Sequence, residues 1–442
     1  MLRPLLGLAL ACLLLGQPAG TTPTAAADWP QWRGPGGQAI AEGAFPDVWS
    51  VTEGIAWKTE IPGRGHSSPV VAANRIFLTT SIQGEQYPGR TAPDHLGFNL
   101  RPGYLHPDSV AVDYAHALHV LAVDAATGAI VWDREVYSGP VFDNRHRKNT
   151  YASSTIATDG AWLYASFESE GFFAFDVDGN LKWQVDFGGL PKAGLGPGTS
   201  PIIFEDLLIV QADQEMGNGS FIAGLNRYTG EVVWMTFRKN RRSWATPILI
   251  DAAGRTELVA SGAEAVVAYD PRTGRELWRT DGVVSHPIPS FVAGHGLVFA
   301  TAGSQRKVAL AIRPGSDGER DGTRVAWRHT KGTAYVPSPI LVGDHFYLLS
   351  DAGIVTCLDA KTGALVYEGG RVPVPATFTA SPVAFGDRIL LTSEDGDTFV
   401  VKAGSAFEVL RTNSVGEPVF ASPALAGSTI YIRGAQHLFA IR

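Results

Sequence analysis

Three short segments of the chain place basic residues just before an aromatic or histidine side chain. These pairs are Arg64 with His66, Arg145–Lys148 with Tyr151, and Arg238–Arg242 with Trp244. Arginine pairs with carboxylate and phosphate groups, and flat side chains stack on flat ligands, so the pattern favours an anionic, partly planar ligand. A solvated loop surface would show the same pattern, and both interpretations stay open. The candidate ligand-binding residues are Arg64, His66, Arg145, Arg147, Tyr151, Arg241, Arg242, Trp244, His286 and Tyr335.

The sequence gives less support to a metal site, a catalytic centre or a haem-attachment site. Four histidines, His95, His106, His116 and His119, fall within 25 residues, but no spacing among them matches a strong metal-ligand signature. We therefore predict no metal site. The sequence has no Gly-x-Ser-x-Gly elbow and no phosphate-binding loop, so no residue receives a catalytic role. The only cysteines are Cys12 and Cys357, and neither lies in a haem-attachment motif.

Internal repeats indicate which elements must position these residues. The segment AVDAATGAIVW (Ala122–Trp132) recurs as AYDPRTGRELW (Ala268–Trp278), and weaker copies end at Trp183, Trp234, Trp327, Tyr367 and Leu410. A second signature, built on Ser-Pro before a β-rich run, precedes each copy. Its eight occurrences start at Ser67, Ser153, Thr199, Ala245, Pro289, Pro337, Ala380 and Ala421. Most are 40 to 52 residues apart, a period typical of propeller blades.

Each repeat contains four short β-rich runs separated by Gly and Asp turns. The last repeat ends at Arg442 with three runs, and Gly54–Ile61 (GIAWKTEI) can supply its missing fourth strand, because Trp57 stands at the repeated tryptophan position. We therefore predict an all-β fold, an eight-bladed β-propeller of four-stranded antiparallel blades closed by an N-terminal strand. The single propeller domain is expected over residues 54–442, with an insertion in blade 1 at residues 82–117.

The position three or four residues before each Ser-Pro site is expected at the mouth of the central channel. Reading round the ring, these residues are His66, Tyr151, Gly198, Trp244, His286, Tyr335, Phe378 and Phe420. Seven of the eight are aromatic or histidine, which suits stacking on a flat ligand. Large side chains that simply fill the channel entrance would give the same pattern, so this alternative also stays open.

The N-terminus has the pattern of a secretion signal. A basic residue, Arg3, precedes an apolar run at Leu5–Leu15, and Ala25–Ala27 offers a cleavage site. We predict a signal peptide at residues 1–27, an extension at residues 28–53, and a periplasmic or extracellular location. Lipid attachment at Cys12 is the alternative. The apolar run is too short to span a membrane, and a net charge of −7 argues against general nucleic-acid binding.

The repeat A-x-D-x-x-T-G-x-x-x-W resembles the tryptophan-docking motif of PQQ-like (quinoprotein-type) propellers, over nearly all of residues 55–442. The opening WPQWRGPGG (Trp29–Gly37) is similar to the start of many secreted bacterial members. The resemblance implies eight blades. The family that the sequence resembles includes two kinds of protein. Quinoprotein dehydrogenases hold PQQ and calcium on the axis, whereas BamB-like proteins have the fold without the cofactor and act in outer-membrane protein assembly.

Two functions follow as expectations. The first is an exported, non-catalytic, monomeric binding scaffold whose cationic, aromatic-lined mouth takes a protein, an anionic small molecule or an acidic glycan. The second is a PQQ- or metal-dependent oxidoreductase. The resemblance implies that such an enzyme needs adjacent cysteines near PQQ, and a chain with Cys12 and Cys357 alone lacks them. We therefore expect no resident cofactor, with PQQ and calcium kept as the alternative.

Overall fold

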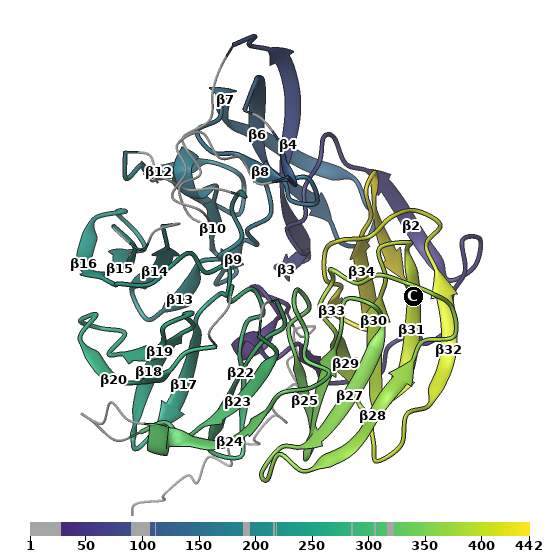
Figure 1. Ribbon diagram of the computed structural model, residues 1–442. Coiled ribbons are helices and arrows are strands. Elements are labelled where there is room, and N and C mark those ends of the chain that lie inside the picture. The colour runs from purple at the N-terminus through teal and green to yellow at the C-terminus, as the bar shows by residue number, and fades with distance from the viewer. Residues whose placement is uncertain are drawn as a thin grey trace, which may run out of the picture.

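The computed structural model describes residues 28–89, 107–110, 112–188, 195–214, 217, 219–283, 286–304, 306–315 and 322–442. In these residues eight antiparallel sheets surround a central axis, as the sequence repeats predict (Figure 1). The short Ser-Pro strand of each repeat lies innermost, and the strand at the repeated tryptophan position lies outermost. The fold is an eight-bladed β-propeller.

The first four blades are built from consecutive strands. Blade 1 consists of β3 (Val70–Ala72), β4 (Arg75–Gln86), β6 (Tyr114–Asp124) and β7 (Ile130–Pro140). Blade 2 consists of β9 (Ala157–Thr158), β10 (Trp162–Ser166), β11 (Phe172–Asp176) and β12 (Leu181–Val185). Blade 3 consists of β13 (Ile202–Phe204), β14 (Leu207–Ala212), β15 (Phe221–Asn226) and β16 (Val232–Phe237). Blade 4 consists of β17 (Ile248–Ala252), β18 (Arg255–Ala260), β19 (Ala265–Tyr269) and β20 (Glu276–Asp281).

The other four blades include two strands from the N-terminal segment. Blade 5 consists of β21 (Val292–Gly294), β22 (Leu297–Ala302), β23 (Val308–Ile312) and β24 (Val325–His329). Blade 6 consists of β25 (Ile340–Val342), β26 (His345–Leu349), β27 (Ile354–Asp359) and β28 (Leu365–Arg371). Blade 7 consists of β29 (Val383–Phe385), β30 (Arg388–Thr392), β31 (Asp397–Lys402) and β32 (Val409–Ser414), with β1 (Ile40–Ala41) parallel to β29. Blade 8 consists of β33 (Ala424–Ala426), β34 (Thr429–Arg433), β35 (His437–Ile441) and β2 (Ile55–Glu60).

The remaining elements are short. Strands β5 (Ser109–Val110) and β8 (Arg145–His146) form a two-stranded sheet, and three 3₁₀ turns are η1 (Pro35–Gly37), η2 (Glu168–Glu170) and η3 (Gly322–Arg324). The ends of the predicted blade-1 insertion lengthen the β4–β6 hairpin, with Ile82 paired to Ala117 and Gln86 to Tyr114. His95 and His106 lie outside the described residues. No helix in the described part of the chain is long and apolar enough to cross a membrane.

A tryptophan on the outer strand of five blades docks on a glycine of the next blade. Trp132 donates from Nε1 to the carbonyl of Val177 at 2.9 Å, and a Cβ added to Gly179 would lie 2.7 Å from its ring. Gly179 also has a φ of 80°, which only glycine adopts easily. The same contact joins Trp57 to Gly128, Trp183 to Gly230, Trp234 to Gly274 and Trp327 to Gly363. The repeated T-G and W are therefore two halves of one inter-blade contact.

The N-terminal strand closes the ring as predicted. Strand β2 pairs antiparallel with β35, from Ile55 opposite Ile441 to Glu60 opposite His437. Its Trp57 donates to the carbonyl of Ala125 in blade 1 at 3.2 Å. The last and first blades are therefore joined by the same tryptophan contact as the others.

Hydroxyl groups of the Ser-Pro signature link the blades at the centre of the ring. In each of seven joints a backbone N–H of one blade donates to a Ser or Thr hydroxyl of the next, at 2.8 to 3.1 Å. The order is Ser68, Thr155, Ser200, Thr246, Ser290, Ser338, Ser381 and Ser422. In blade 2 the linking residue is Thr155, one position later than the sequence alignment at Ser153-Ser154 suggests. The chain of links therefore runs from blade 1 to blade 8.

The first part of the predicted N-terminal extension, residues 29–41, lies against the inner strands at the centre of the ring (purple in Figure 1). Trp29 is 1% exposed and bridges to Val71 of blade 1, and the carbonyl of Pro30 accepts from the N–H of Thr158 in blade 2. Across the ring, Arg33 donates to the carbonyl of Pro339 at 2.6 Å. Residues 29–41 thus form a plug on the axis, a role that its non-repetitive sequence did not reveal.

Candidate binding cavity at the channel mouth

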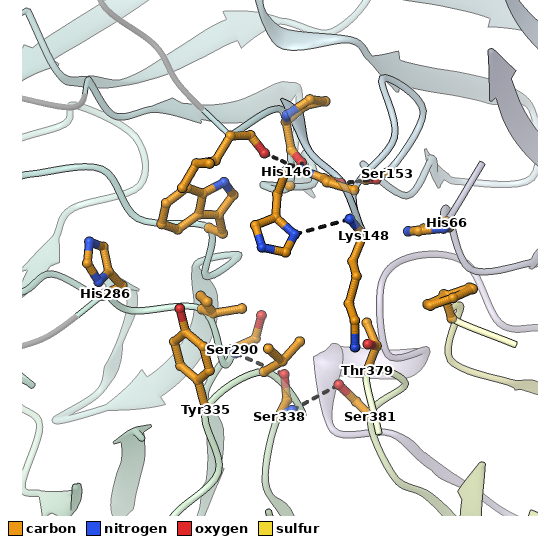
Figure 2. A pocket seen from close by; sticks show the side chains of 18 of the residues that line it. His66, His146, Lys148, Ser153, His286, Ser290, Tyr335, Ser338, Thr379 and Ser381 are labelled. Carbon is orange, nitrogen blue, oxygen red and sulfur yellow. Dashed lines mark hydrogen bonds between the residues drawn. The ribbon is translucent and has the colours of Figure 1, made fainter. Parts of the chain in front are cut away.

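A cavity of about 550 Å³ lies on the propeller axis, where the loops between blades converge. Loops before all eight inner strands contribute to its wall, and the plug contributes Trp32. His66 and His286 lie on opposite sides, and the side chain of Lys148 extends between them (Figure 2). A cavity of this size, built on a rigid ring, is large enough for a drug-sized ligand or a protein side chain.

Several aromatic and histidine rings contribute to the wall of the cavity. His66 stacks on Phe420 with ring centroids 4.8 Å apart, and Trp244 lies 6.1 Å from His286 in a tilted arrangement. The Nε1 of Trp244 donates to the carbonyl of Gly196 at 3.0 Å, which fixes the orientation of its ring. These rings offer flat faces in fixed positions, as stacking on a ligand requires.

The floor carries hydroxyl groups that have hydrogen atoms to donate. Each of these oxygens accepts an N–H from the preceding blade, and none donates to an acceptor in the described part of the chain. They belong to Ser200, Ser290, Ser338, Ser381 and Ser422, all of which line the cavity. A ligand that presents oxygen acceptors to this ring would satisfy these donors.

Trp32 closes the cavity on the side of the plug. Its Nε1 donates to the hydroxyl of Ser290 at 2.9 Å. Trp32 and Ser290 also line a second cavity of about 240 Å³, enclosed by the plug and by apolar residues of blades 3 to 5. Trp32 and Ser290 are therefore shared by the walls of both cavities. No pattern in the sequence predicts this role, because Trp32 stands outside every repeat.

The sequence-predicted residues divide into two groups. His66, Trp244, His286 and Tyr335 line the cavity, as do Gly198 and Phe420 from the predicted mouth positions. The other candidates, Arg64, Arg145, Arg147, Tyr151, Arg241 and Arg242, lie outside its lining. Tyr151 and Phe378 are 2% and 1% exposed and belong to the apolar core, so at these two mouth positions the core interpretation holds. Lys148 is the only lysine or arginine among the described lining residues.

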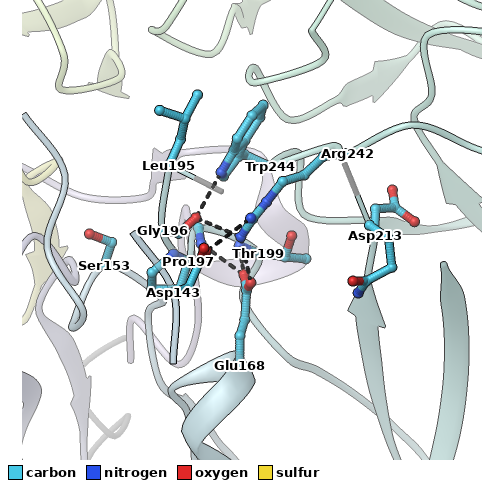
Figure 3. Close-up of polar contacts among 12 residues, drawn as sticks. Asp143, Ser153, Glu168, Leu195, Gly196, Pro197, Thr199, Asp213, Arg242 and Trp244 are labelled. Carbon is cyan, nitrogen blue, oxygen red and sulfur yellow. Dashed lines mark hydrogen bonds and ion pairs between the residues drawn. The ribbon is translucent and has the colours of Figure 1, made fainter. Parts of the chain in front are cut away.

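Arg242 is a structural residue that supports Trp244. Its guanidinium is buried between Asp143 (3.1 Å) and Glu168 (3.2 Å), and it donates to the Gly196 carbonyl that also holds Trp244 (Figure 3). Burial raises the pKa of Asp143 to about 6, although Arg242 opposes the shift. Its neighbour Arg241 is exposed and pairs with Glu264 at 3.5 Å. Adjacent arginines of one basic run therefore have different surroundings.

Further carboxylates pair with Arg147 and with its neighbours His146 and Lys148 at the mouth. Asp108 lies 2.7 Å from Arg147 and 3.6 Å from His146, and Glu394 lies 2.9 Å from Lys148. These pairs neutralise much of the charge that the basic runs bring to this face.

The surroundings of His66 keep a positive potential. Burial, followed by the charges of Arg64, Arg433 and Arg145, holds the pKa of His66 well below its usual value, so the ring is neutral at pH 7. Burial and then Arg145 lower the pKa of His116 to about 4, and its Nδ1 lies 2.9 Å from the hydroxyl of Ser81. His119 instead pairs with Asp133 at 2.7 Å. The two described members of the four-histidine group, His116 and His119, therefore make separate contacts.

Fold and site together define a β-propeller with a donor-rich, aromatic cavity at the mouth of its channel. Residues 116–368 match the family described as outer membrane protein assembly factor BamB, and because this is more than half of the chain, the protein belongs to that family. The sequence matches no curated protein.

Solved structures show the same fold at low sequence identity. BamB from Moraxella catarrhalis is 15% identical with a TM-score of 0.54, covering 87% of this chain and 98% of that one. The computationally designed Ika8 protein is 11% identical with a TM-score of 0.53, covering 80% and 98%. A europium-containing methanol dehydrogenase is 13% identical with a TM-score of 0.46, covering 93% and 90%. At sequence identities this low, the similarity shows a shared fold and nothing about function.

Proposed function

We propose that this protein is an exported, non-catalytic binding propeller whose mouth cavity holds a flat, acceptor-rich, anionic group of a ligand or partner. The observation that carries the proposal is the cavity itself, with five serine hydroxyls at its floor and aromatic rings on its wall. A flat group can stack on the rings while its edge oxygens accept from the hydroxyls. Both sets of contacts are already in place, so little ordering accompanies binding.

The family and the N-terminal signal pattern support a role outside the cytoplasm. The family is named for outer-membrane protein assembly, and residues 1–27 have the sequence features of a signal peptide. A periplasmic location next to the outer membrane agrees with both. There, the group in the cavity would belong to a protein segment, an acidic glycan or a small molecule.

A PQQ-dependent oxidoreductase is the second candidate, and the described residues fit it only in part. A flat tricarboxylate suits the rings and donors of the cavity. Calcium, however, takes six to eight oxygen ligands, and Asp108 is the only carboxylate of the described lining and pairs with Arg147. Cys357 is buried in blade 6, away from the cavity lining. These residues favour binding of a flat anion without a calcium-quinone centre.

The test is a calorimetric titration of the purified protein lacking residues 1–27. The three probes are PQQ, an acidic oligosaccharide and an acidic unfolded peptide. Trp244→Ala removes a ring from the wall, and Phe237→Ala is the matched control, because Phe237 is 73% exposed on β16. We expect at least one probe to bind, with about tenfold weaker binding in Trp244→Ala and no change in Phe237→Ala. Equal binding in all three proteins would exclude the cavity as the site. Dye reduction that depends on PQQ would favour the oxidoreductase.

A further inference from the structure

The joint between blades 8 and 1 differs from the other seven. The hydroxyl links of the inner ring run from Ser68 to Ser422, and no link joins Ser422 back to Ser68. The Ser68 hydroxyl is buried, in a residue 2% exposed, and has no hydrogen-bond partner among the described residues. The Ser68 hydroxyl thus differs from the equivalent hydroxyls of the other seven blades, each of which accepts an N–H from the preceding blade.

A buried arginine occupies this joint. Arg433 of β34 is 2% exposed, and its Nη1 donates to the Ser67 hydroxyl at 2.7 Å and to the carbonyl of Thr79 at 2.6 Å. Its guanidinium also leaves no room for a side chain at Gly65, next to His66. Burial lowers the pKa of Arg433 to about 9, so at pH 7 it keeps its charge. A buried charge of this kind is destabilising unless an opposite charge lies nearby.

Two more arginines lie near enough to lower the pKa of the His66 ring by their charge. Arg64 is exposed at the mouth and donates to the carbonyl of Arg147 at 3.2 Å, and Arg145 lies over the ring of Tyr151. Arg64, Arg145 and Arg433 have no ion-pair partner within the described part of the chain. Four other basic residues at the mouth have carboxylate partners: Arg147 with Asp108, Lys148 with Glu394, Arg241 with Glu264 and Arg242 with Asp143.

A protein of net charge −7 thus concentrates unmatched positive charge at one joint, beside a histidine that lines the cavity. We infer that the joint between blades 8 and 1 is an oxyanion subsite that adjoins the mouth cavity at His66, where a carboxylate or tetrahedral oxyanion faces His66 and is held by Arg64, Arg145 and Arg433, which lie just beyond the lining of the cavity. The inference rests on the proposed function, because the oxyanion would be the charged end of the group bound in the cavity. It adds Arg433 to the site and removes Arg241 and Arg242 from it.

The experiment uses sulfate and acetate as probes on the protein without residues 1–27. Histidine imidazole resonances are followed by NMR during each titration, with His66 assigned from a His66→Gln variant. An anion at the joint should shift the His66 resonances and raise the pKa of its ring, since it offsets the three positive charges. A preference for sulfate indicates a tetrahedral anion as the natural group, and a preference for acetate indicates a carboxylate.

Arg64→Gln is the main variant, because Arg64 is exposed and its replacement leaves the core intact. We expect at least tenfold weaker binding of the preferred anion in Arg64→Gln and in Arg145→Gln. The matched control is Arg241→Gln, whose charge lies on the same face but is paired, and we expect less than twofold change. Arg433→Lys keeps the charge at the joint and should keep binding within about threefold.

Two results would overturn the subsite: no shift of His66 with either anion, or equal weakening in Arg64→Gln and Arg241→Gln. The proposed function has a separate outcome. A flat probe that binds wild type and Arg64→Gln equally, yet depends on Trp244, keeps the cavity and removes the subsite. Anion binding at His66 without binding of any flat probe keeps the subsite and removes the proposed ligand class.

Discussion

The indole ring of Trp57 packs on Gly128, so that a Cβ on this glycine would lie 2.7 Å from the ring. The two residues belong to the last and the first blade, and the contact repeats the one that joins consecutive blades elsewhere. Gly128 has a φ of 79°, so both its backbone and its surroundings require glycine. Closure of the ring thus depends on two residues that are separated in sequence by the first three strands of blade 1.

Gly128→Ala should destabilise the protein through this contact. The substitution combines backbone strain of about 1–2 kcal/mol with a clash that costs about 1–3 kcal/mol more. Gly160→Ala is the matched control, because Gly160 has a φ of 86° and open space where the Cβ would lie. Denaturant unfolding should show the larger loss for Gly128→Ala. Equal losses would mean that the tryptophan contact does not limit stability at the closure.

Thr155 allows the inner ring of hydroxyl links to be tested. Its Oγ1 accepts from the buried N–H of Ser68 at 3.0 Å. Thr155→Val keeps the shape but leaves this donor without a partner, which costs about 1–3 kcal/mol. Thr155→Ser keeps the hydroxyl that five other blades use and should lose less than about 1 kcal/mol. The free energy of unfolding of both variants checks this, and a reversed order would show that packing, not the link, matters here.

His116 should make the protein sensitive to acid. Its pKa is lowered to about 4 in the folded state, below the 6.5 of the unfolded chain. Between these values the unfolded state binds more protons, so stability decreases as the pH falls from about 6.5 to 4. His116→Gln retains an acceptor for the Ser81 hydroxyl and removes the titration. The melting temperature of this variant should decrease less over that range than that of wild type. Parallel curves would contradict the shift.

Replacement by alanine should affect stability differently at Trp32 and Trp29, although both residues lie in the plug. Trp29 is 1% exposed and packs against Gly34, so Trp29→Ala is expected to cost about 3–5 kcal/mol. Trp32 lines both cavities, so Trp32→Ala should cost clearly less. We expect it to weaken binding of any probe that the mouth cavity takes. Thermal melts and the titrations above measure both effects.

The sequence predicted the propeller because its signals are contacts between neighbouring repeats. The T-G and W of successive blades meet directly, so their period gives the number of blades and even the closing strand at Trp57. Mouth positions such as His66 and Trp244 followed by counting from the Ser-Pro site. The different environments of Arg241 and Arg242 did not follow, because Asp143 and Glu168, which pair with Arg242, come from blade loops far away in sequence. The plug was missed for a related reason, since Trp32 belongs to no repeat.

Substitutions at the neighbouring residues Arg241 and Arg242 distinguish a structural role of an arginine from a role in ligand binding. Arg242→Ala would leave Asp143 and Glu168 buried without their cation, and loss of one partner from a buried pair costs about 3–5 kcal/mol. It would also release the Gly196 carbonyl that orients Trp244, so binding should weaken together with stability. Arg241→Ala removes an exposed pair worth about 0–1 kcal/mol and should change neither. Melting temperatures and calorimetric titrations of the two variants test this. If Arg241→Ala abolished binding while Arg242→Ala left both properties intact, the ligand would contact the outer loop face and not the cavity.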